Sequence, residues 1–174
     1  MGKQKFWILM LTVFFIFSGF GFGGEKKEAA KKIETLNRTI NEAASKGDLQ
    51  KAIMAAEDAL AIATKSFGEN SFETAKAMNN VANLYMYAGH PGEAERLYKN
   101  SILIEVEEKG GDSLEAADSY YNLAMAYAMQ KKYDPAGKML NQALKIRTKE
   151  LGASHPETLK VQKMLDEVWS QQKS

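Results

Sequence analysis

Residues 79–98 read NNVANLYMYAGHPGEAERLY, and this stretch decides the fold. Small and apolar residues recur at three and four positions before Gly89 and again after Gly92, which is the spacing that lines one face of a helix. The turn-forming residues between these two glycines separate one helical pattern from the other. The stretch therefore predicts the centre of a helical hairpin, whose second helix continues to the glycine pair at 110–111.

The same pattern recurs along the chain at a constant spacing of 42 residues. A fixed period of this length is typical of proteins built from stacked helical hairpins. Alanines near the start of each second helix keep this register, and we expect them to be buried where two antiparallel helices approach closely. The residues in register include Ala52, Ala94 and Ala136; Gly68, Gly110 and Gly152; Leu60, Ile102 and Leu144; and Glu73, Glu115 and Glu157.

Three segments of the chain resemble the tetratricopeptide repeat, and more closely its longer variant of the kinesin light chain type. These segments are Asn79 to Tyr85, Glu93 to Lys99 and Leu151 to Thr158. The resemblance runs from about residue 29 to residue 169. It implies an all-α fold, a right-handed tetratricopeptide-repeat superhelix of three helical hairpins plus a C-terminal capping helix.

The hairpins are expected at about 28–66, 71–109 and 113–151, and the capping helix at about 156–172. The first hairpin departs most from the pattern of the family, because residues 39–43 replace the Asn-apolar-Ala run of the other units. Terminal repeats are often atypical in this way, since one of their faces meets solvent.

The N-terminal residues have the layout of a secretory signal. Lys3 and Lys5 precede an unbroken apolar run over residues 6–17, and small residues follow this run. The run is shorter than the roughly 20 residues that a helix needs to span a hydrocarbon core. The sequence therefore predicts an exported protein, secreted or periplasmic.

We expect the signal to cover residues 1–23, with cleavage between Gly23 and Gly24. The tetratricopeptide-repeat domain would then occupy residues 24–174. The alternative is an uncleaved segment, with the protein anchored in a membrane by residues 6–22. Without that anchor, the mature domain has no feature that predicts membrane binding.

Composition excludes several classes of function. Lysine and arginine number 23 and aspartate and glutamate 22, so no overall field favours nucleic acid or an anionic membrane surface. The chain has no cysteine, which removes disulfides, thiolate ligands and a cysteine nucleophile. His90 and His155 each precede a proline in an expected turn, and no cluster has metal-ligand spacing. We therefore predict no catalytic residue, no metal and no cofactor.

The resemblance implies that the first helices of successive units line a concave, partner-binding groove. Asparagine amides in such a groove can bond the backbone of an extended peptide, and methionines can adapt to varied apolar shapes. The candidate groove residues are Asn37, Asn41, Lys76, Asn79, Asn80, Asn83, Tyr87, Asp118, Tyr121, Asn122, Met125 and Met129.

Within this set Asn79 and Asn83 are expected to be exposed. Asn80 and Asn122 have an equally good alternative role, a hydrogen bond between adjacent helices. We expect Glu105 to lie on a solvated helix face. The groove matches only part of the carboxylate clamp of the family, because the third unit lacks a second basic residue.

These observations predict an exported, non-catalytic protein–protein interaction module that binds a protein or peptide segment on its concave face. The alternative is a structural subunit that self-assembles as a homo-oligomer or packs into a larger cell-envelope complex. Three repeats are about the minimum for a stable stack, so another chain could cover the apolar surface that the first hairpin leaves open.

Overall fold

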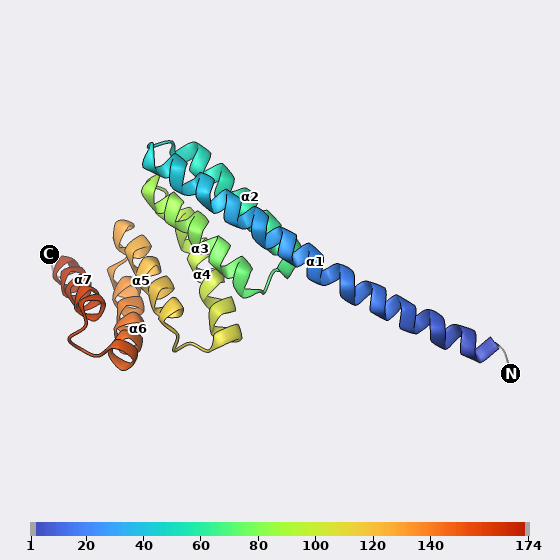
Figure 1. Cartoon of the computed structure of the whole chain (residues 1–174). Coiled ribbons are helices and arrows are strands. Elements are labelled where there is room, and N and C mark those ends of the chain that lie inside the picture. Colours follow the sequence, from blue (N-terminus) through green and yellow to red (C-terminus); the bar gives the residue numbers. More distant parts are fainter. Residues whose placement is uncertain (1–2, 173–174) are drawn as a thin grey trace.

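The computed structural model describes the backbone of residues 3–172 and the side chains of residues 23–172. In this part of the chain every regular element is an α-helix. The helices follow one another through the stack from the N-terminal to the C-terminal side (Figure 1). Their bounds are α1 Lys3–Ser45, α2 Leu49–Phe67, α3 Phe72–Tyr87, α4 Pro91–Lys109, α5 Leu114–Met129, α6 Tyr133–Leu151 and α7 Pro156–Gln172.

Recurring helix ends explain the 42-residue period. Ser71 and Ser113 stand before α3 and α5 in extended conformation, and each hydroxyl oxygen accepts a hydrogen bond from the backbone N–H three residues on. This N-cap pairs one of the four backbone donors that a helix start leaves free. The second helices end at Gly68, Gly110 and Gly152, whose φ angles are 101°, 80° and 93°. Only glycine adopts such angles without strain, so the sequence fixes where each hairpin stops.

The core of each hairpin is a close contact between two helices. Ala52, Ala94 and Ala136 are all 0% exposed, which confirms the expectation that these positions have no room for a larger side chain. At the C-terminal end, the ring of Trp169 from α7 packs over Gly137 of α6, where an added Cβ would collide with it. The last helix thus covers the third hairpin.

Packing follows chain order: α1 pairs with α2, α3 with α4 and α5 with α6, and each hairpin stacks on the next. α7 packs against α6, and its buried residues Val161, Leu165 and Val168 face the stack. The predicted all-α tetratricopeptide-repeat fold of three hairpins and a capping helix is confirmed.

The N-terminal half of α1 projects beyond the stack (Figure 1). The expected cleavage point between Gly23 and Gly24 lies inside this continuous helix. The side chains of the expected signal segment, residues 3–22, lie outside the described residues, as do Met1 and Gly2 altogether. Among the residues that are described, no helix combines the length and the apolar character needed to cross a membrane.

Candidate functional site

A pocket of about 470 Å³ lies between α3 and α5, on the side of the stack formed by the first helices. We call it the α3–α5 pocket. It brings together five of the predicted groove residues, and two residues outside the predicted set complete it. Its lining is Asn83, Met86, Tyr87, Tyr98, Tyr121, Asn122 and Met125.

The α3–α5 pocket has apolar walls and an amide floor. Tyr87 is 80% exposed and forms one rim, while Tyr121 and Met125 are half-buried on the facing helix. None of the seven lining side chains carries a formal charge at neutral pH. The pocket is therefore suited to an uncharged side chain.

The floor is built by Asn83. Its side-chain oxygen accepts a hydrogen bond of 2.5 Å from the hydroxyl of Tyr98 and one of 3.3 Å from the amide of Asn122. Burial, with a smaller contribution from Tyr87, raises the pKa of Tyr98 well above its usual value, so this hydroxyl remains a donor at neutral pH. Asn122 thus makes the cross-helix bond considered as its alternative role. The expected exposure of Asn83 is wrong, because its side chain is half-buried in this network.

Asn79 lies one helical turn before Asn83, and its expected exposure is also wrong. Its amide nitrogen donates to Glu105 at 2.9 Å and to Ser119 at 2.8 Å, and its oxygen accepts from Ser101 at 2.6 Å. These three bonds join α3 to both α4 and α5. Because its hydrogen-bonding groups are all engaged inside the fold, Asn79 is a structural residue beneath the groove.

The expectation that Glu105 lies on a solvated helix face is wrong as well, because this residue is only 1% exposed. Burial raises the pKa of its carboxyl group, hydrogen bonds from Ser119 and Asn79 oppose that shift, and the charges of Glu115 and Asp118 add to it. One carboxylate oxygen accepts from Asn79, and the other has no hydrogen-bond partner among the described residues. A buried acid thus lies behind the α3–α5 pocket.

At the repeat position equivalent to Glu105, α6 carries Arg147, which is also buried. Its guanidinium donates to Asp118 at 2.5 Å and to the carboxylate of Glu157 at 3.1 Å. The same group lies 5.6 Å from the ring centroid of Tyr121, and Lys160 lies 5.3 Å from that centroid. Asp118 is therefore engaged in an ion pair instead of facing a partner freely.

The remaining predicted groove residues do not line the α3–α5 pocket. Asn37 and Asn41 lie on α1, while Lys76 is exposed on α3 with its ammonium group 5.8 Å from the ring centroid of Phe72. Asn80 is exposed on α3, and Met129 is 52% exposed at the end of α5. The structure thus gathers five predicted residues of the second and third units in the pocket, and leaves the other residues of those units and both residues of the first unit outside it.

Two pocket residues were missed by sequence reasoning, Met86 and Tyr98. The sequence places Tyr98 on a second helix, and only first helices were considered as groove-forming. The repeat register holds a usable signal, because Ala56 and Leu140 occupy the positions equivalent to Tyr98. A larger side chain with a polar tip at that position reaches through to the floor of the pocket.

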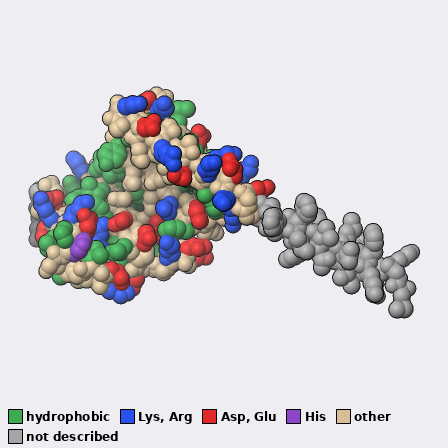
Figure 2. All heavy atoms as spheres, in the orientation of Figure 1, with side chains coloured by type: hydrophobic (Ala, Val, Ile, Leu, Met, Phe, Trp, Pro, Cys, Tyr) green, Lys and Arg blue, Asp and Glu red, His purple; other side chains and the backbone are tan. Residues whose placement is uncertain are grey.

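The described side chains contain no group of three or more histidine, aspartate or glutamate residues placed to hold a metal ion. On the face shown in Figure 2, basic and acidic side chains are interspersed and no patch of a single sign stands out. The lining of the α3–α5 pocket itself consists of amide, aromatic and methionine side chains.

Comparison with known proteins places the chain in a family. The tetratricopeptide repeat model matches residues 42–104, 75–149 and 115–165. The chain therefore belongs to the tetratricopeptide repeat family, whose stacked hairpins form extended concave binding surfaces. No curated protein matches the chain in sequence.

Solved structures show the same fold at low sequence identity. One is a kinesin light chain from Podosopora anserina with nearly identical TPR-like repeats, with a TM-score of 0.73, 22% identity, and coverage of 85% of this chain and 68% of the other. Another is BtubC (BKLC) from P. vanneervenii, with a TM-score of 0.71, 23% identity, and coverage of 87% and 67%. A third is the TPR2B domain of yeast Sti1 in complex with pHsp70, with a TM-score of 0.63, 18% identity, and coverage of 81% and 98%. The likeness confirms a repeat fold of the kinesin light chain kind.

Proposed function

We propose that this protein is an exported, non-catalytic interaction module that binds a segment of another protein along its first helices, with the α3–α5 pocket as the anchor point. The observation that carries the proposal is the pocket itself, a hollow of about 470 Å³ with uncharged walls and an exposed tyrosine at its rim. The family and the TPR2B domain of yeast Sti1 in complex with pHsp70 support a segment of another protein as the class of ligand.

The bound segment is extended and places one uncharged side chain in the pocket. Tyr87, Tyr121 and Met125 surround such a side chain, and the flexible methionine adapts to its shape. Asn80 is exposed on α3, about one helical turn before the pocket residue Asn83. Its amide is available to bond the peptide backbone beside the pocket. Because Asn79 and Asn83 are engaged within the fold, fewer amides serve the ligand than the sequence predicts.

Export is the second part of the proposal. It rests on the basic start, the apolar run over residues 6–17 and the small residues up to Gly24. Cleavage between Gly23 and Gly24 releases a secreted or periplasmic domain, and the alternative is a protein held at a membrane by residues 6–22. N-terminal sequencing of the protein from its envelope fraction decides between the two forms, and a retained Met1 on cytoplasmic protein contradicts export.

The groove is tested with peptides selected from a random displayed library on the full protein. We expect Tyr87→Ala and Met125→Ala each to weaken binding of the selected peptides by about tenfold, since each removes apolar contact from the anchor. Leu103→Ala is the matched control, because Leu103 is 68% exposed on α4 and does not line the pocket. If the original protein and all three variants bound the selected peptides with equal affinity, the binding surface would lie elsewhere.

A further inference from the structure

A second hollow, of about 510 Å³, lies between the second helices α2 and α4, and we call it the α2–α4 cleft. Its apolar lining is Met78, Leu103 and Ile104, and Leu103 is 68% exposed. Glu69 and Glu107 supply its charges, and no lysine, arginine or histidine is among its lining residues. The α2–α4 cleft shares no lining residue with the α3–α5 pocket, so the two surfaces are separate.

The two carboxylates of the α2–α4 cleft are not balanced by the chain itself. Neither Glu69 nor Glu107 makes an ion pair or a side-chain hydrogen bond within the described residues. The lysines close to them in sequence are engaged elsewhere. Lys65 lines a hollow between α1 and α2, Lys99 pairs within α4, and Lys109 pairs with the start of α5. The charge of the cleft is therefore negative and open to a partner.

Glu107 is an unusual residue for its position. It lies in the last turn of α4, where the free carbonyl groups of the helix are negative and favour a cation. At the equivalent repeat position, α2 carries Lys65 and α6 carries Lys149. An acid in this place conflicts with both the helix and the repeat pattern, and such local conflicts are expected at functional positions.

The next repeat shows what can fill a cleft of this kind. There Lys149 of α6 donates a hydrogen bond of 2.9 Å to Asp112, in the connection between α4 and α5. The equivalent positions of the α2–α4 cleft hold Glu107 and Asn70, and Leu103 also replaces a lysine of the next repeat. The α2–α4 cleft thus lacks the ammonium group with which the chain fills the following cleft.

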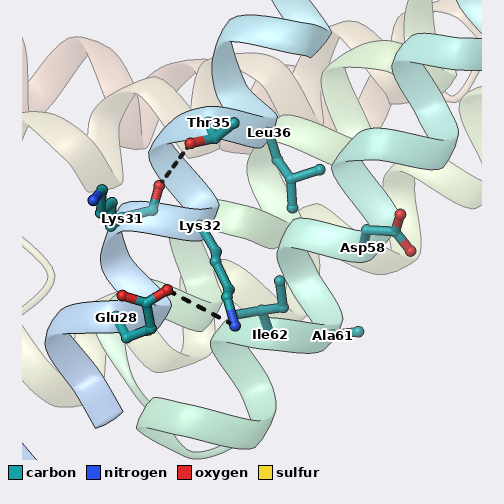
Figure 3. A pocket seen from close by; sticks show the side chains of 8 residues that line it. All are labelled: Glu28, Lys31, Lys32, Thr35, Leu36, Asp58, Ala61 and Ile62. Carbon is teal, nitrogen blue, oxygen red and sulfur yellow. Dashed lines mark hydrogen bonds and ion pairs between the residues drawn. The ribbon is translucent and has the colours of Figure 1, made fainter. Parts of the chain in front are cut away.

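The hollow between α1 and α2 lacks this single sign of charge. Figure 3 shows Glu28 paired with Lys32, and the two atoms of this pair are 3.9 Å apart. Lys31 lies on the same helix, and Asp58 lies on α2. Because both signs line that hollow, its charges favour no particular kind of partner, whereas those of the α2–α4 cleft favour a cation.

We propose that the α2–α4 cleft binds a protein segment that presents a lysine or arginine side chain beside an apolar residue. The cationic group pairs with the carboxylates of the cleft, as Lys149 pairs with Asp112 in the next repeat, and the apolar residue lies on Leu103. Opposite charges of this kind select a partner and orient it. The domain then has two docking surfaces, an uncharged one at the α3–α5 pocket and an acidic one at the α2–α4 cleft.

The test uses a random displayed peptide library that is first depleted on the Glu107→Lys variant and then selected on the original full protein. Peptides that remain depend on Glu107, and we expect them to be enriched in lysine or arginine next to an apolar residue. A synthetic copy of such a peptide should bind about fivefold more weakly to Glu69→Gln and to Glu107→Gln, and about tenfold more weakly to Leu103→Asp. Its affinity should also fall as the salt concentration rises.

Two controls assign the binding to the α2–α4 cleft. Glu108→Gln is the matched control, because Glu108 is exposed on α4 and does not line the cleft. Tyr87→Ala should leave the affinity of these peptides within about twofold, whereas peptides bound in the α3–α5 pocket respond to Tyr87→Ala and not to Leu103→Ala. Failure at one surface is therefore distinguishable from failure at the other.

A double variant closes the α2–α4 cleft from within. Asn70→Asp with Glu107→Lys rebuilds the ion pair that the next repeat has at the equivalent positions. We expect this variant to lose the peptide while thermal melts show an unchanged midpoint, because the exchanged residues are exposed.

Three outcomes overturn the proposal. The first is a selection that yields no peptide, or peptides without an excess of lysine and arginine. The second is a selected peptide whose affinity is unchanged in Glu69→Gln, Glu107→Gln and Leu103→Asp. The third is sedimentation of the original protein as an oligomer that Glu107→Lys dissociates, which would assign the cleft to a second copy of this chain.

Discussion

Equivalent positions in two neighbouring repeats carry opposite charges, and both are buried. Glu105 lies where α3, α4 and α5 meet, and Arg147 lies where α5, α6 and α7 meet. We call these places the middle joint and the last joint. The repeat register places the two residues 42 positions apart, so the backbone surroundings are the same and the side chains around them make the difference.

The middle joint is held by neutral donors. Asn79, Ser101 and Ser119 surround Glu105, and Asn79 alone makes three hydrogen bonds there. The last joint has Tyr121, Ala143 and Val161 at the equivalent positions, which supply no such network. The charge of Arg147 instead reaches Asp118 and Glu157 near the surface. A repeat scaffold can thus bury a charge either among amides and hydroxyls or against ion partners at the edge of the joint.

The difference also affects the candidate groove. At the middle joint, Asn83 lies one helical turn after Asn79 and forms the floor of the α3–α5 pocket, where its partners are Tyr98 and Asn122. At the last joint, Arg147 and Lys160 flank the ring of Tyr121. The pocket therefore lies between an amide floor on one side and a cationic border on the other.

The largest expected effect comes from breaking the middle joint with Asn79→Ala. This change removes three hydrogen bonds and leaves Glu105 buried with fewer partners, so we expect a loss of about 2–4 kcal/mol in the free energy of unfolding. Denaturant melts measure it. Asn80→Ala is the control on the same helix, because Asn80 is exposed and its change should stay within about 0.5 kcal/mol. Equal stability of the two variants would contradict the structural role of Asn79.

Two equivalent substitutions test whether the repeats differ only at their joints. Ala94→Leu and Ala136→Leu each force added methylenes into a fully buried contact within one hairpin, and each should lose about 1–3 kcal/mol. Since the two contacts are equivalent, we expect similar losses in denaturant melts. Clearly unequal losses in the free energy of unfolding would show that the two hairpins differ in their internal packing as well as at their joints.

The last joint should be weakened less, and in a way that depends on salt. Arg147→Met removes the ion pairs with Asp118 and Glu157, whose side chains are 63% and 49% exposed and can regain water. We expect a loss of about 1–2 kcal/mol at low salt that shrinks at high salt, since salt screens exposed charges. Denaturant melts at two salt concentrations measure it, and the Asn79→Ala loss should change little between them. Salt dependence in both variants, or in neither, would remove the distinction between the joints.

The fold could be predicted from the sequence because the repeat period of the chain shows where each helical hairpin begins and ends. Helix ends, close alanine contacts and the capping helix all depend on residues near one another in sequence or in repeat register. The groove was predicted in part, since Tyr87, Tyr121 and Met125 do meet in the α3–α5 pocket. Their meeting follows from the stacking of first helices, which the repeat implies.

The buried polar network was missed because its partners lie 22 to 40 residues apart, and a polar side chain alone predicts exposure. A signal was present in the register. Ser101 stands where the next repeat has Ala143, and Ser119 stands where the next has Val161. Polar residues at positions that are otherwise apolar, in phase with Asn79, indicate a group that needs partners inside the fold.

The smallest expected effect concerns Glu105 itself and depends on pH. Burial, the largest cause, raises its folded-state pKa above the unfolded value of about 4.3. Near pH 4 the acid is largely protonated in both states, so its contribution to stability is present. As the pH rises towards and through the raised folded pKa, the unfolded state ionises more readily and that contribution is lost. Glu105→Gln cannot ionise, so we expect its thermal midpoint to exceed that of the original protein by about 1–3 °C at pH 8 and to match it near pH 4.

Thermal melts followed by circular dichroism from pH 4 to pH 8 measure the difference, with Glu108→Gln as the control because Glu108 is exposed on the same helix. The sign of the result separates two states of the middle joint. A rise at high pH means that Glu105 resists ionisation, as expected for a buried carboxyl group whose pKa is raised further by the charges of Glu115 and Asp118. A loss at high pH would mean that donors from Asn79 and Ser119 stabilise the charged form. The middle joint would then hold its charge as firmly as the last joint holds Arg147, and the two joints would differ only in the sign of the buried group.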